Sequence, residues 1–103
     1  MAIECINTME IRLIEAPNSS FAETAQIYVA GLQDASGCRD YTLTRSTQES
    51  DLWWLTGYWE SESQMTDSFK SPPMLQMINY LIGAGASLCF ASLASQSVVV
   101  LSD

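Results

Sequence analysis

The sequence predicts an α+β domain in which strands and helices follow one another in the order β-α-β-β-α-β. Three observations predict it. Four stretches alternate between apolar and polar residues or are rich in aromatic residues, as strands are. Segments between them carry apolar residues at helical spacing, and turn-forming residues separate the two kinds of segment. Because the chain has 103 residues and shows no internal repeat or linker, one domain over residues 1–103 is expected.

The first strand is expected over residues 3–14, where apolar side chains fall on one face and polar side chains on the other. Asn7 is the polar exception on the apolar face. A helix follows, and its start is marked by Ser20 and Glu23, which match the S-x-x-E pattern of a capping box. The helix is expected to end before Gly37, a position suited to positive φ.

The second and third strands are expected over residues 38–46 and 51–60, joined by a short polar loop. The third strand is apolar on both faces, with Leu52, Trp54 and Tyr58 on one and Trp53, Leu55 and Trp59 on the other. A strand of this kind must be covered on both sides, and two helices cover only one. A second copy of the chain is therefore the expected cover for the other face. The alternative is a monomer whose aromatic residues line an internal pocket, and both ideas hold if the interface leaves a cavity.

The second helical segment opens at Ser61 and Gln64, another capping box, and Pro72 suits the first position of a further helix. A final strand is expected over residues 86–94, and residues 98–101 form a β-prone tail. This order of elements is that of a ferredoxin-like fold with an antiparallel four-stranded sheet.

Charge and composition exclude several classes of function. The net charge of −8 disfavours nucleic acids and anionic membranes as partners. No apolar run approaches the roughly 20 residues of a membrane span, and no secretory signal is visible, so a cytoplasmic protein with reduced cysteines is expected. The chain has no histidine, which removes the commonest general base and the usual zinc and haem ligand. No metal site or cofactor is expected.

Three short motifs occur in order along this framework. Gly37-Cys38-x-x-Tyr41 opens the second strand, Trp54-Leu-Thr-Gly-Tyr-Trp-Glu-Ser-Glu62 ends the third, and Phe69-Lys-Ser-Pro-Pro-Met74 follows. Together they resemble the antibiotic biosynthesis monooxygenase superfamily of dimeric α/β-barrel proteins, over roughly residues 3 to 90. The resemblance implies a homodimer and, in the monooxygenases, cofactor-independent attack of dioxygen on a phenolic substrate held between sheet and helices.

Other members of the superfamily degrade haem, isomerise small signalling molecules or have no known activity. The chain departs from their pattern at Pro73, where many relatives carry histidine, and at Ile78, near the place of the iron-binding histidine. Ser68 stands near the helical tryptophan of the haem-degrading relatives, and only their strand-one asparagine is retained, as Asn7. Haem degradation is therefore not expected.

The candidate site combines these considerations. Asn7, Tyr58 and Arg39 are the candidate catalytic residues, as polar groups able to contact a substrate oxygen. The candidate substrate-binding residues are Trp54, Trp59, Tyr41, Met65, Phe69, Met74 and Ile78. The predicted function is cofactor-independent monooxygenation of a hydrophobic phenolic or quinol-like molecule. The alternative is a non-catalytic dimeric domain that binds a ligand or responds to stress, in which these residues form ordinary core.

Overall fold

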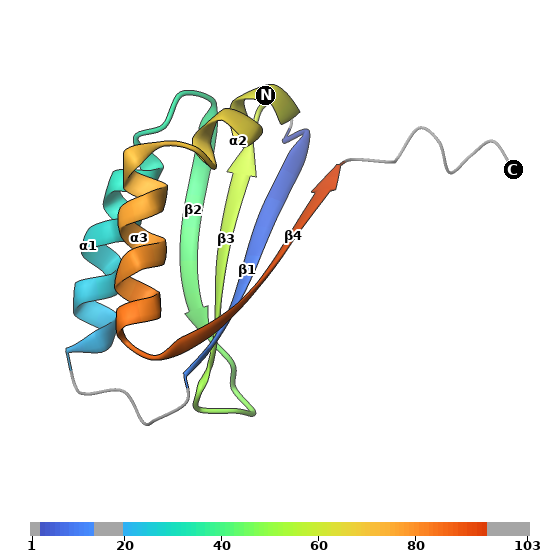
Figure 1. Ribbon diagram of the computed structural model, residues 1–103. Helices are drawn as coiled ribbons and strands as arrows, with labels where there is room; N and C mark the ends of the chain where they lie inside the picture. The colour runs from blue at the N-terminus through green and yellow to red at the C-terminus, as the bar shows by residue number, and fades with distance from the viewer. Residues whose placement is uncertain (1–2, 14–19, 95–103) are drawn as a thin grey trace, which may run out of the picture.

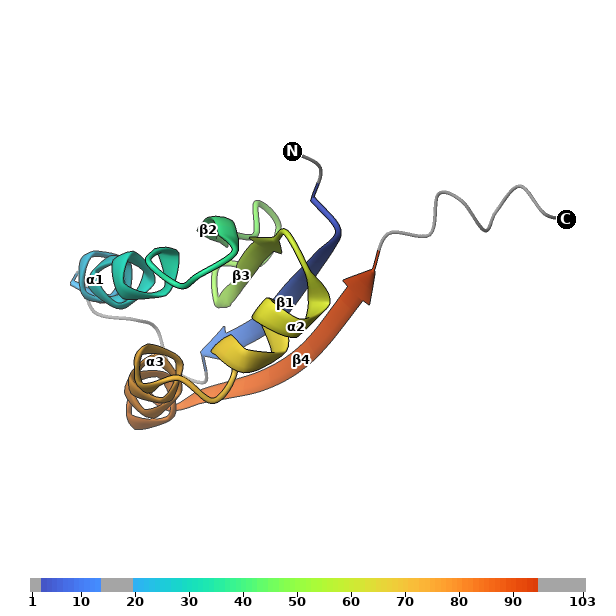
Figure 2. The same cartoon turned by 90° about the horizontal axis from the view of Figure 1, so that it is seen from above.

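The structure is a computed structural model that describes residues 3–13 and 20–94. The elements follow as β1 (Cys5–Leu13), α1 (Phe21–Gln33), β2 (Cys38–Arg45), β3 (Leu52–Trp59), α2 (Glu62–Ser68), α3 (Pro72–Gly83) and β4 (Ala86–Ala94). The strands form one antiparallel sheet in the order β2-β3-β1-β4, with the helices on one face of it (Figures 1 and 2). This confirms the predicted α+β ferredoxin-like fold. The β-prone tail at residues 98–101 lies outside the described residues.

The face of the sheet beneath the helices carries the core. Alternate residues of β1 from Cys5 to Leu13 are buried, as the strand pattern predicted, and Asn7 is buried among them. From β3, Leu55 and Trp59 point to the same face and are fully buried. The core is closed by apolar side chains of the helices, namely Phe21, Ala25, Val29, Leu32, Met65, Met74, Met77 and Leu81.

The opposite face of the sheet, here called the open face, has none of the described helices over it (Figure 2). Register places Tyr58 of β3 on this face beside Ile6 of β1 and Trp54 beside Glu10, which confirms the predicted division of the third strand. Trp54 keeps 38% of its surface exposed and Leu93 of β4 keeps 55%. The open face therefore presents apolar surface to its surroundings.

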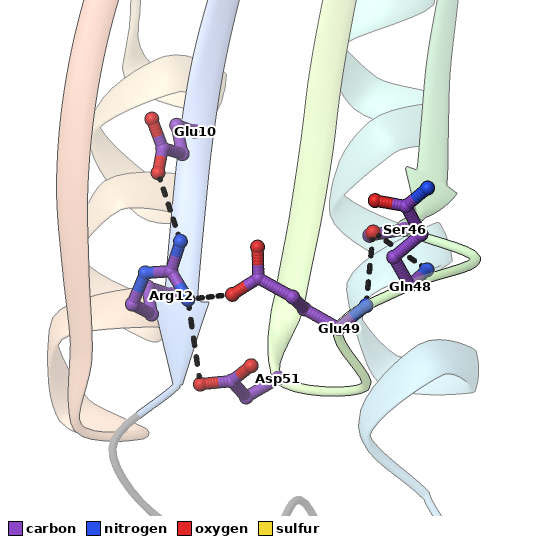
Figure 3. Close-up of polar contacts among 6 residues, drawn as sticks. All are labelled: Glu10, Arg12, Ser46, Gln48, Glu49 and Asp51. Carbon is purple, nitrogen blue, oxygen red and sulfur yellow. Dashed lines mark hydrogen bonds and ion pairs between the residues drawn. The ribbon is translucent and has the colours of Figure 1, made fainter.

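An ionic cluster marks one end of the open face (Figure 3). The Arg12 guanidinium lies 2.7 Å from a Glu49 carboxylate oxygen, 3.5 Å from Glu10 and 3.6 Å from Asp51. Glu49 and Asp51 belong to the hairpin between β2 and β3, so these contacts tie the hairpin to β1. The pairs are exposed to solvent, and pairs of this kind add little to stability.

The helix starts agree only partly with the predicted capping boxes. Ser61 is the N-cap of α2, and its hydroxyl accepts a hydrogen bond from the Gln64 backbone N–H at 3.3 Å. Ser20 is the N-cap of α1, but its side chain makes no capping hydrogen bond, so the capping role predicted for that side chain is wrong. Gly37 has φ of +83°, as predicted for the turn that leads into β2.

No helix among residues 3–13 and 20–94 is long and apolar enough to cross a membrane.

Candidate functional site

A cavity of about 380 Å³ lies between Phe69 and α3 on one side and β1 and β4 on the other. This volume is within the range of small-molecule sites. Most of the lining is apolar, and Asn7, Thr8 and Ser92 are its polar members. The remaining lining residues are Met9, Phe69, Met74, Ile78, Phe90 and Ala91.

Asn7 is the buried polar residue in the wall of this cavity, with 4% of its surface exposed. Its amide oxygen Oδ1 accepts a hydrogen bond from the Trp59 indole Nε1–H at 2.7 Å. The Tyr41 hydroxyl lies 3.0 Å from the amide nitrogen Nδ2 and 3.3 Å from Oδ1. The two partners come from β3 and β2, on the side of β1 opposite to β4. The structure thus joins three residues predicted for the site, although Trp59 and Tyr41 lie behind Asn7 and do not line the cavity.

Gly57 makes this arrangement possible. In the sheet it stands directly between Asn7 on β1 and Tyr41 on β2. A Cβ at position 57 would lie 2.5 Å from the Asn7 Oδ1 and 2.7 Å from the Tyr41 Cζ. Asn7 and Tyr41 therefore meet across β3 only because the position between them carries no side chain.

The cavity is electrically neutral, because none of its lining residues among the described part of the chain is titratable. Nearby, burial raises the pKa of Tyr41 to about 12, and this outweighs the opposing effect of its hydrogen bond with Asn7. Tyr41 is consequently a neutral phenol at physiological pH and not a base. Burial also raises the pKa of the Cys5 and Cys38 thiols, so neither is an activated nucleophile.

The other predicted site residues divide into two groups. Phe69, Met74 and Ile78 line the cavity, as expected of substrate-binding residues. The rest lie elsewhere: Met65 in the core, Trp54 and Tyr58 on the open face, and Arg39 on the surface. Arg39 donates a hydrogen bond to the Glu60 carboxylate at 2.8 Å and belongs to an irregularity in the pairing of β2 with β3. Within one subunit these last residues do not converge with Asn7.

Sequence reasoning missed the β4 side of the cavity. Ser92 pairs directly with Asn7 across the β1–β4 ladder, so the two side chains share a face and sit next to each other. Phe90 stands beside Met9 in the same way. The signal available in the sequence was the alternation within residues 86–94, but it does not reveal which strand lies next to β4.

Haem does not fit the residues that line this cavity. The resemblance places the iron-binding histidine of haem-degrading relatives near Ile78, which here contributes a hydrocarbon side chain to the cavity wall. Pro73, where many relatives carry histidine, lies in the first turn of α3. The chain has no histidine elsewhere that could substitute.

Comparison with known families decides the membership of the chain. The family model for antibiotic biosynthesis monooxygenase matches residues 6–80. The chain belongs to this family. The matched residues run from β1, which carries Asn7, into α3. They therefore include the β1 wall of the cavity and the helices above it. A search of curated proteins found no significant match.

Solved structures share the antibiotic biosynthesis monooxygenase fold with this chain at low sequence identity. SnoaB, a cofactor-independent oxygenase from Streptomyces nogalater, superposes with a TM-score of 0.77 at 15% identity, covering 91% of this chain and 94% of SnoaB. A conserved protein of unknown function from Bacteroides thetaiotaomicron gives 0.76 at 17% identity, covering 91% and 100%. PA3566 from Pseudomonas aeruginosa gives 0.73 at 14% identity, covering 92% and 96%. At these identities the likeness concerns the fold alone.

Proposed function

We propose that this chain is a cofactor-independent monooxygenase that acts on a hydrophobic phenolic or quinol-like molecule bound in the cavity described above. The observation that carries the proposal is an apolar cavity of about 380 Å³ with a buried asparagine amide in its wall. A flat aromatic molecule matches the apolar lining, and Asn7 and Ser92 supply polar contacts along one wall. Family membership and the fold shared with SnoaB, a cofactor-independent oxygenase, support the reaction type.

The reactivity of the substrate itself accounts for the reaction. For an anthrone, loss of a proton gives a carbanion that transfers electrons to dioxygen; one oxygen atom becomes the new ring carbonyl and the other leaves as water. The described lining offers no base, so the proton passes to water or hydroxide. The protein's contribution is to bind the ring and to orient it through Asn7.

The test is oxygen consumption with a panel of quinols and anthrones. We expect uptake of one dioxygen per anthrone oxidised and a loss of at least tenfold in rate for Asn7→Ala. Asn79→Ala is the matched control, because Asn79 is an exposed asparagine of α3 outside the cavity lining. If Asn7→Ala does not fold, Asn7→Asp keeps the shape and an acceptor for Trp59. Equal rates with and without protein across the panel would refute the proposal.

The neutrality of the cavity favours a second candidate, a non-catalytic domain that binds a hydrophobic ligand. In that case the same aromatic molecules bind with the same requirement for Asn7, but no oxygen is consumed. Binding measured by equilibrium dialysis beside oxygen uptake therefore separates the two candidates.

We also propose that the chain forms a homodimer through the open face. Trp54 and Leu93 leave apolar surface there that a second sheet would cover. Tyr58, which lies on the same face, would then contact the partner copy, and any catalytic part for it would depend on that contact. Sedimentation velocity at micromolar concentration tests the proposal, and a single well-folded subunit would refute it.

A further inference from the structure

We infer that the cavity selects ligands by a hydrogen-bond acceptor, such as a carbonyl or an ionised phenol oxygen, because the Asn7 amide is locked with only an N–H available to the ligand. The inference rests on the proposed function only in taking the cavity as the ligand site. It concerns which polar group of the ligand is recognised, and it holds for an enzyme or for a binding domain.

The lock is the hydrogen bond from Trp59. An asparagine side chain has one acceptor end and one donor end, and rotation by 180° exchanges them. The Trp59 indole nitrogen is a donor only, and it lies 2.7 Å from Oδ1. Rotation of the amide would place Nδ2 against the indole N–H, donor against donor. Because Trp59 is completely buried, water cannot relieve that conflict.

Tyr41 uses part of the remaining capacity of the amide. Its hydroxyl lies within hydrogen-bond distance of both Nδ2 and Oδ1. Of the two Nδ2 hydrogens, the one that Tyr41 accepts is therefore the one on the same side of the amide as Oδ1. The second Nδ2 hydrogen points the other way and has no partner among the described residues. Both partners of Asn7 approach from β2 and β3, whereas the cavity lies toward β4. The group left for a ligand is therefore an amide N–H.

Tyr41 alone would not set this polarity, because a hydroxyl both donates and accepts. The hydroxyl of Ser92, the neighbour of Asn7 on β4, also both donates and accepts, so it does not favour either orientation of the amide. Trp59 is thus the positioning residue that determines specificity, and Gly57 leaves the space in which Asn7 and Tyr41 meet.

The test compares two neutral bicyclic probes of similar size, 1-indanone, which only accepts a hydrogen bond, and indole, which only donates one. Dissociation constants come from NMR titration of the full chain. We expect 1-indanone to bind about tenfold more tightly, the effect of one hydrogen bond made against one buried N–H left unpaired. During the titration the Asn7 side-chain N–H signals should move more than the Trp59 indole N–H signal. Equal binding of the two probes, or tighter binding of indole, would overturn the inference.

Variants separate the lock from general packing. Trp59→Phe removes the donor and frees the amide to rotate, so the tenfold preference should fall toward one. Trp53→Phe is the matched control on the same strand, because the Trp53 indole nitrogen is buried without a hydrogen-bond partner in the described structure, and its variant should keep the preference. Tyr41→Phe should also keep it. A merely structural role for Trp59 would weaken both probes equally and leave the preference unchanged.

The outcome is independent of the oxygen-uptake assay. A tenfold preference without oxygen consumption would refute the monooxygenase proposal and leave this inference standing. Oxygen consumption without any preference would do the reverse. If Trp59→Phe does not fold, the preference of the wild-type chain and its retention in Tyr41→Phe decide the matter.

Discussion

Gly57→Ala is the substitution for which the structure allows the clearest quantitative prediction. The added methyl group would lie 2.5 Å from the Asn7 Oδ1 and 2.7 Å from the Tyr41 Cζ, closer than atoms in folded proteins approach. Tyr41 cannot simply move aside, since it is buried and its ring packs edge-on against Trp59 at 6.1 Å between centroids. Asn7 is held in place by the hydrogen bond that it accepts from the Trp59 indole N–H.

The cost follows from three effects. Overpacking of this kind costs about 1–3 kcal/mol, and loss of the hydrogen bond between Asn7 and Tyr41 adds about 1 kcal/mol. The lower entropy of the unfolded alanine variant returns about 0.4–1 kcal/mol. We therefore expect a net loss of about 1–3.6 kcal/mol in the free energy of unfolding. For a domain of this size that lowers Tm by roughly 5–20 °C.

Urea and thermal denaturation measure this loss, and Gly83→Ala is the matched control. A Cβ at Gly83 meets nothing within 4 Å, and Gly83 closes α3 without positive φ. Its alanine variant should be neutral or more stable by up to about 1 kcal/mol. If Gly57→Ala were as stable as Gly83→Ala, the close approach of Asn7 and Tyr41 across β3 would be contradicted, and so would the geometry of the site.

Three further predictions concern other parts of the molecule. Trp54 has 38% of its surface exposed, about 95 Å² of a side chain of roughly 250 Å², so its burial in a dimer contributes about 2.4 kcal/mol per subunit. Trp54→Lys should therefore weaken dimerisation at least 1,000-fold, as measured by ultracentrifugation. Ile27→Lys, which changes an exposed residue of α1, should not weaken it. The pKa of Tyr41 rises from 10.0 to about 12 on folding, so between pH 10 and 12 Tyr41 is ionised in the unfolded chain but neutral in the folded chain. About 2–3 kcal/mol of the free energy of unfolding should therefore be lost as the pH rises from 10 to 12, as measured by urea denaturation, and Tyr41→Phe should not show this loss. Ser61→Ala should cost about 1 kcal/mol by urea denaturation, since the α2 cap is lost; an unchanged midpoint would contradict the capping role.

The sequence was sufficient for the fold because the information needed there is local. The period of two in residues 3–14 and 51–60 places Asn7 beneath the helices and separates Trp53 from Trp54. Gly37 marks its own turn, because few other residues adopt its positive φ. These features depend on neighbours along the chain, and each can be deduced from a short window of residues.

The site depended on information that a short window does not contain. Contact between Asn7 and Tyr41 needs both the strand order and the register of two ladders, and the structural need for glycine at position 57 follows only from those. The position of Arg39 could not be predicted for a related reason: an irregularity between Cys38 and Asp40 shifts the alternation of β2, and the Arg39 side chain contacts Glu60. The alternation of apolar and polar residues in a sequence does not reveal that a strand contains one extra, unpaired residue.

A neutral cavity also limits which phenolic substrates could react. Transferring a substrate anion from water into apolar surroundings raises the pKa of the substrate and so opposes ionisation. One charge-assisted hydrogen bond from the Asn7 amide returns about 1.5–3 kcal/mol, which offsets roughly one to two pKa units. With no lining base to add to this, turnover should follow the acidity of the substrate itself. Across a series of substituted anthrones at pH 7, the rate should rise steadily as the anthrone pKa falls, and for each compound it should rise with pH up to that pKa. A bell-shaped profile common to all substrates would reveal an ionising group of the protein at the reaction centre and would refute this view of the cavity.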